Sequence, residues 1–86
     1  MNRLNELRSE IDFIDFEINK LFIKRLEIVE QIRLEKRKLN MDILDTNREI
    51  EIYKQLKLNS KKKNFKYSKD LFENILRISK SYQEEI

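Results

Sequence analysis

Apolar residues recur through the first part of the chain at alternating steps of three and four residues. They stand at Leu4, Leu7, Ile11, Ile14, Ile18, Leu21, Ile28 and Ile32. This spacing lines them up along one face of a helix. It predicts a helix over residues 4–38, about 50 Å long at about 1.5 Å per residue. One position in the row is polar, because Arg25 lies between Leu21 and Ile28.

A helix of this length is too long for the fold of a single small chain to cover. A compact chain of 86 residues has a radius of gyration of about 12 Å, and therefore a diameter of about 30 Å. The helix would extend beyond that fold and leave part of its apolar row uncovered. A second copy of the chain is the simplest cover, so we expect a homodimer in which the long helices pack together.

The segment 39–44 breaks the helical pattern and is predicted to connect the long helix to a second one. Asp45 or Thr46 can cap that second helix, and Thr46 with Glu49 has the spacing of a capping box. The second helix is predicted over residues 46–57.

A third helix is predicted over residues 68–84, after a lysine-rich polar stretch at 58–66 that we expect to be a loop. Ser68 is predicted to cap this helix, with Asp70 in its first turn. The sequence therefore predicts an all-α fold. A single domain over residues 1–86 would contain three helices, of which the first is very long.

The composition excludes many kinds of catalytic site. The chain has no His, Cys, Gly or Pro, so it lacks an imidazole base, a thiolate nucleophile and a glycine-rich phosphate loop. A net charge of +3 is small for nucleic-acid binding. No apolar run has the length of a signal peptide or membrane span. We expect a cytoplasmic protein with no metal, no cofactor, and neither nucleic acid nor membrane as a partner.

Polar residues interrupt the inner face of each predicted helix. They are Arg25 and Lys36 in the first helix, Asp45, Arg48 and Glu49 in the second, and Ser79 and Gln83 in the third. A buried guanidinium is costly unless it meets an anion. One interpretation is an internal network in which Arg25 pairs with Glu49 or Asp45. The other is a polar pocket that binds a small anion, such as a carboxylate.

Taken in order, these residues resemble the all-helical (type II) chorismate mutase family. The similarity extends over residues 4–83, through Leu7-Arg8-x-x-Ile11-Asp12-x-Ile14-Asp15, Arg25, Lys36, Asp45-x-x-Arg48-Glu49 and Ser79-x-x-x-Gln83. It implies an intertwined all-α homodimer with two equivalent active sites. It also implies a monofunctional isomerase that converts chorismate to prephenate by a Claisen rearrangement, on the route to phenylalanine and tyrosine.

The resemblance implies that two arginines hold the carboxylates of chorismate. Arg8 is similar to the arginine that reaches into the site of the partner chain, and Arg25 to the one that binds from the same chain. Lys36 and Gln83 are similar to the pair that hydrogen-bonds the ether oxygen as the C–O bond breaks. Ser79 is similar to a further carboxylate contact.

The second helix supplies the other end of the site in this family. The resemblance implies that Glu49 accepts a hydrogen bond from the hydroxyl group of the substrate ring, with Asp45 nearby. It also implies that Arg48 organises these two carboxylates. Apolar residues similar to the family's pocket walls are Ile32, Ile52 and Leu76.

Two alternatives remain open from the sequence. An isochorismate-pyruvate lyase on the same fold shares the arginines and the lysine, although Asp45, Arg48, Glu49, Ser79 and Gln83 together favour the mutase. A non-catalytic helical dimer or interaction module is an alternative from a different class.

Overall fold

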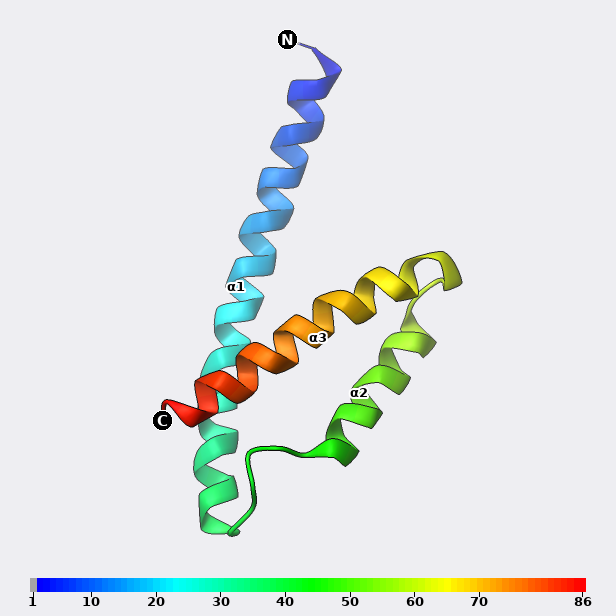
Figure 1. Ribbon diagram of the computed structural model, residues 1–86. Coiled ribbons are helices and arrows are strands. Elements are labelled where there is room, and N and C mark those ends of the chain that lie inside the picture. The colour runs from blue at the N-terminus through cyan, green and yellow to red at the C-terminus, as the bar shows by residue number, and fades with distance from the viewer. Residues whose placement is uncertain (1) are drawn as a thin grey trace.

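Three α-helices make up the chain in a computed structural model that describes residues 2–86 (Figure 1). Helix α1 spans Arg3–Lys38, α2 spans Thr46–Asn59 and α3 spans Lys62–Glu84. The described residues contain no β-strand. The all-α class and the very long first helix, both predicted from the apolar periodicity, are therefore confirmed.

Asparagines help to terminate helix α1 at both ends, Asn2 as its N-cap and Asn40 directly after its C-cap residue, Leu39. At its start, the side chain of Asn2 accepts a hydrogen bond of 2.9 Å from the backbone N–H of Asn5. At its end, Asn40 has a φ of 53°. Its N–H donates to the carbonyl of Arg37, and the N–H of Met41 donates to the carbonyl of Lys36. This is the Schellman arrangement, in which asparagine takes the left-handed position that glycine usually occupies. A chain without glycine can therefore still end a long helix sharply.

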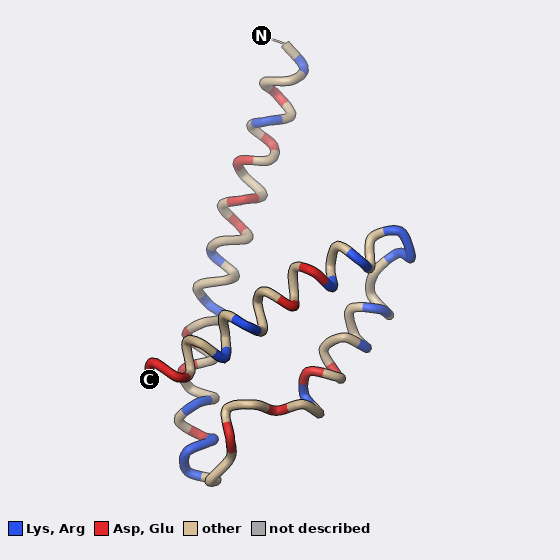
Figure 2. Tube along the Cα trace, in the orientation of Figure 1, with Lys and Arg blue, Asp and Glu red and all other residues tan. Residues whose placement is uncertain are grey.

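The connection between α2 and α3 is much shorter than predicted. We expected a loop over residues 58–66 and a helix beginning near Ser68, but only Ser60 and Lys61 separate the two helices. The prediction that Ser68 caps α3 is wrong, because Ser68 lies inside the helix. Lysine is a good helix former, and solvent covers its charge as readily on a helix as in a loop. Figure 2 shows the lysines grouped where α2 ends and α3 begins.

Helix α3 joins the other two helices together. It crosses the C-terminal half of α1 and runs beside α2, whereas the N-terminal half of α1 projects away from both (Figure 1). The described residues extend over 57 × 28 × 15 Å, with a radius of gyration of 16.3 Å. A compact chain of this size would have a radius near 12 Å. The long helix therefore extends beyond the rest of the fold, as its predicted length implied.

The core of one chain is small, and the projecting half of α1 has little cover. Val29 and Leu76 are the buried apolar residues of the described chain. By contrast, apolar side chains along α1 are between 41% and 63% exposed, namely Leu4, Leu7, Ile11, Ile14, Ile18 and Leu21. Monomeric proteins rarely leave so continuous an apolar row in water.

Within residues 2–86, none of the helices is both long enough and apolar enough to cross a membrane.

Candidate functional site

A pocket of about 390 Å³ lies where the three helices come together. Its apolar wall includes the three residues expected from the resemblance, Ile32, Ile52 and Leu76. Five cationic side chains and two carboxylates also line it, namely Lys24, Arg25, Lys36, Arg48 and Lys80 with Asp45 and Glu49. This excess of positive charge over an apolar wall suits a small organic anion.

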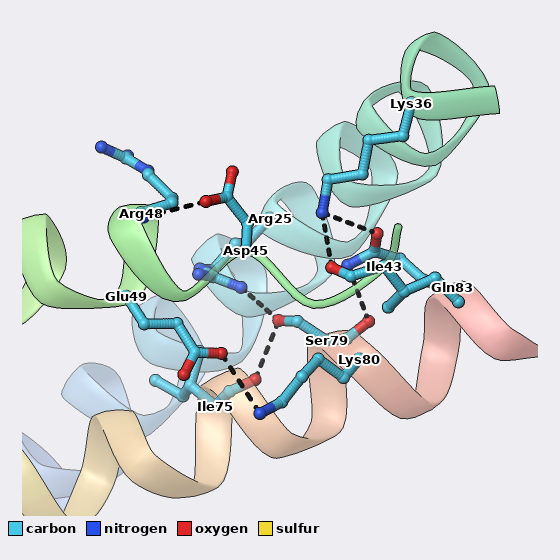
Figure 3. Close-up of polar contacts among 10 residues, drawn as sticks. All are labelled: Arg25, Lys36, Ile43, Asp45, Arg48, Glu49, Ile75, Ser79, Lys80 and Gln83. Carbon is cyan, nitrogen blue, oxygen red and sulfur yellow. Dashed lines mark hydrogen bonds and ion pairs between the residues drawn. The ribbon is translucent and has the colours of Figure 1, made fainter. Parts of the chain in front are cut away.

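Arg25, on α1, lines this pocket. Its guanidinium donates a hydrogen bond to the hydroxyl oxygen of Ser79 on α3, and that hydroxyl contacts the carbonyl oxygen of Ile75 at 2.8 Å (Figure 3). Arg25 is half-buried. Burial lowers the pKa of its guanidinium, and the nearby charge of Arg48 lowers this pKa further. Both effects would be relieved by an anion bound beside Arg25.

The internal network considered from the sequence does not form. Among the ion pairs of residues 2–86, none joins Arg25 to Asp45 or Glu49. Glu49 pairs instead with Lys80. The side chain of Asp45 accepts a hydrogen bond from a backbone N–H. Arg25 thus has no carboxylate partner among residues 2–86.

Lys36 and Gln83 meet at the other end of the pocket (Figure 3). The Lys36 ammonium is 2.6 Å from the carbonyl oxygen of Ile43 and 3.4 Å from the side-chain oxygen of Gln83. The amide nitrogen of Gln83 donates to the carbonyl oxygen of Ser79 at 3.3 Å. Gln83 is only 6% exposed. Gln83 thus turns its amide oxygen toward Lys36 and bonds Ser79 through its amide nitrogen, and both Lys36 and Gln83 line the pocket.

The start of α2 brings the acidic residues to the pocket. Asp45 caps the helix, since its carboxylate accepts from the backbone N–H of Arg48 at 3.1 Å. Asp45 is therefore the N-cap of α2, and the capping box expected between Thr46 and Glu49 does not cap the helix. The guanidinium of Arg48 pairs with Glu51 at 3.1 Å and points away from the other labelled side chains (Figure 3). Arg48 thus contacts Asp45 through its backbone N–H, and its side chain pairs with Glu51.

Arg8 lies outside this pocket. It is exposed on the projecting half of α1, about 25 Å along the helix from Arg25 at about 1.5 Å per residue. The pocket of one chain therefore contains seven of the eight predicted site residues: Arg25, Lys36, Asp45, Arg48, Glu49, Ser79 and Gln83.

Helix α3 contributes the predicted Ser79 to the pocket, together with one residue that was not predicted. Ser79 is 5% exposed and lines the pocket, whereas Ser81 is exposed on another face. Lys80, which was not predicted, lines the pocket and pairs with Glu49. The spacing of Leu76, Lys80 and Gln83 fits one helical face, so the apolar row could have pointed to it.

The described residues contain no group of three or more acidic side chains placed to hold a metal ion. What the pocket offers is a set of cations and hydrogen-bond donors held over an apolar wall. Such a site can bind an organic anion and stabilise negative charge that develops on it.

The fold and the site define an all-helical chain with a pocket between its helices that is rich in cationic side chains. The sequence matches the family described as chorismate mutase type II over residues 7–84. The chain therefore belongs to the type II chorismate mutase family.

One curated relative is similar to nearly the whole of this chain. The T-protein of Haemophilus influenzae (strain ATCC 51907 / DSM 11121 / KW20 / Rd) is 39% identical over 87 aligned residues, which cover 99% of this chain. The chain spans 22% of the length of that protein. No solved structure matches the chain at a significant level.

Proposed function

We propose that this protein converts chorismate to prephenate by a Claisen rearrangement, as a step toward phenylalanine and tyrosine. The observation that carries the proposal is the position of Arg25. Its half-buried guanidinium lacks a carboxylate partner among the described residues and faces a cation-rich pocket. A substrate carboxylate is the anion that this arrangement lacks.

The reaction is an isomerisation in which the ether C–O bond breaks while a new C–C bond forms. It needs the flexible dianion to be held in a compact, chair-like conformation. Holding the substrate in this way lowers the activation barrier, because the reacting atoms are already oriented. We assign one carboxylate to Arg25, supported by Ser79, and the other to Arg8 of a second chain. Glu49 accepts the hydroxyl group of the ring, beside Asp45 and Arg48.

Negative charge grows on the ether oxygen as the C–O bond lengthens. The Lys36 ammonium lies 3.4 Å from the side-chain oxygen of Gln83. We therefore assign to the ether oxygen one N–H of Lys36 and the amide N–H of Gln83 that is not bonded to Ser79. Donors already fixed before the reaction stabilise the transition state without further reorganisation. Neither a nucleophile nor a general base takes part in this step.

We propose a homodimer in which the exposed apolar rows of two α1 helices cover each other. Pairing would bury the side chains that one chain leaves in water. It would also carry Arg8 toward the pocket of the partner, since Arg8 projects away from the pocket of its own chain. Two equivalent, shared active sites follow from this arrangement.

The direct test supplies chorismate and isochorismate separately and identifies the products. We expect prephenate from chorismate. Salicylate and pyruvate formed from isochorismate, at a much higher efficiency than prephenate from chorismate, would instead indicate an isochorismate-pyruvate lyase. No reaction with either substrate would favour the non-catalytic dimer.

A further inference from the structure

We propose that Lys80 is a positioning residue for Glu49, and that it helps the site select substrates with a ring hydroxyl group. This inference rests on the proposed function, in which Glu49 accepts that hydroxyl. Lys80 does not belong to the set of residues that the resemblance supplied.

The ion pair of Lys80 and Glu49 differs from the other three ion pairs of residues 2–86. Those three each join residues three apart on the exposed surface of one helix, where an ion pair contributes little. The Lys80 ammonium instead reaches from α3 to Glu49 on α2, at 3.1 Å. Its two side chains are 36% and 26% exposed, against 54–72% for the others. Partial burial reduces screening by solvent and salt.

The geometry leaves Glu49 able to bind a substrate. Lys80 contacts one carboxylate oxygen, Oε2, and the second oxygen has no partner among the hydrogen bonds and ion pairs of the described residues. Both side chains line the pocket, and Figure 3 shows them reaching toward each other from facing helices. A carboxylate with one oxygen held by an ammonium has fewer rotamers available. Its free oxygen can therefore accept a hydrogen bond from a substrate hydroxyl group in a fixed direction.

Tyr53 lies one helical turn beyond Glu49 on α2, and the charges of Glu49 and Lys80 both act on it. Burial raises the pKa of its hydroxyl group most, Glu73 and Glu49 raise this pKa further, and Lys80 lowers it. The phenol is therefore neutral near pH 7 and cannot serve as a counterion for Lys80. Glu49 is the anion that Lys80 reaches.

The test compares Lys80→Met, Lys80→Arg, Glu49→Gln and the double variant Lys80→Met with Glu49→Gln. Methionine keeps the length of the side chain and removes its charge. We expect Lys80→Met to raise KM for chorismate about fivefold with kcat nearly unchanged, because a positioned hydroxyl contact acts mainly on binding. Arginine should restore KM to within about twofold, since it also reaches and pairs with a carboxylate. Lys69→Met is the matched control, because Lys69 is exposed on α3 outside the pocket.

The double variant separates positioning from direct binding. If Lys80 acts through Glu49, adding Lys80→Met to Glu49→Gln should change kcat/KM by less than about twofold, because the two effects are coupled. An equal loss in both backgrounds would overturn the inference and assign Lys80 to direct contact with the substrate. An unchanged KM in Lys80→Met would also overturn it, while prephenate formation by the unmodified protein would leave the proposed function intact. No prephenate from the unmodified protein would overturn both.

Discussion

The guanidinium of Arg25 on α1 donates a hydrogen bond to the hydroxyl of Ser79 on α3. This contact holds the arginine in the lining of the pocket before any ligand arrives. Ser79 is itself held by the carbonyl of Ile75, so neither side chain must be ordered when substrate binds. Donors fixed in this way favour the transition state over the flexible substrate.

Replacing Arg25 tests whether the pocket is catalytic. Arg25→Ala should lower kcat for prephenate formation by about 100-fold or more, the usual cost of losing a transition-state contact. Arg25→Lys should restore little, because an ammonium lacks the forked geometry that binds a carboxylate through two hydrogen bonds. The measurement is initial rate against chorismate concentration, with oligomeric state checked by ultracentrifugation.

The control for Arg25 is Arg77→Ala, which removes an exposed arginine outside this pocket. It should leave kcat unchanged. If Arg25→Ala altered the free energy of unfolding while leaving activity unaffected, the pocket would be structural and the non-catalytic alternative would stand.

The amide of Gln83 predicts how activity depends on pH. An amide donates a hydrogen bond at any pH, whereas a carboxylic acid donates only while protonated. The unmodified protein should therefore show a nearly constant kcat/KM from pH 5 to pH 8. In Gln83→Glu, kcat/KM should fall as pH rises through this range, because the carboxylate repels the developing charge on the ether oxygen. A steep loss in the unmodified protein would argue against this role for Gln83.

Asp45 has both a structural and a proposed functional role, and two variants separate them. Asp45→Ala removes the side chain that caps α2 and should lower the free energy of unfolding by about 1 kcal/mol. Asp45→Asn preserves a cap of similar strength but removes the charge beside the pocket. Urea unfolding should therefore distinguish alanine from asparagine, whereas any loss of kcat/KM common to both reports on the carboxylate. Equal stability of all three proteins would contradict the capping role.

The exposed row of α1 predicts how the chain associates. Ile14 is 49% exposed within that row, so Ile14→Lys would place a charge inside the proposed dimer interface. We expect this variant to sediment as a monomer and to lose prephenate formation, because each site would lack Arg8 from a partner. Lys20→Ala, which changes an exposed polar position of the same helix, should remain dimeric. A dimeric Ile14→Lys would mean that the row is covered in another way.

The sequence predicted elements well where apolar periodicity or a cap determines them. Helix α1 follows from its regular row, and Asp45 caps α2 as one of the two residues proposed. The start of α3 was missed because a lysine run gives the same polar signal in a loop and on a solvated helix. Lys80 was missed because Ser79 and Lys80 both fit the helical face of Leu76 and Gln83, and only Ser79 was assigned to that face. In the structure both line the pocket.

A mixed dimer gives the sharpest test of a shared active site. Arg8→Ala and Arg25→Ala chains should each be inactive alone, because every site in either homodimer lacks one arginine. When the two chains are mixed and allowed to exchange, one of the two sites in each mixed dimer has Arg8 from one chain and Arg25 from the other. The second site lacks both arginines. Prephenate formation should therefore recover to about half the unmodified rate per mixed dimer, since arginines at separate positions act in the same site.

The control mixes Arg25→Ala with Gln83→Ala, two changes within the pocket of one chain. If sites are shared as proposed, every site of this mixed dimer takes its pocket from one variant chain and still lacks either Arg25 or Gln83, so activity should not recover. Recovery in the first mixture and not in the second assigns Arg8 to the partner's site. The failure of both mixtures to recover, with chain exchange verified by mass spectrometry, would mean that Arg8 does not act across the dimer. If the Arg8→Ala chain alone kept full activity, Arg8 would be a surface residue of α1, and Arg25 with the other pocket residues would have to bind both carboxylates without it.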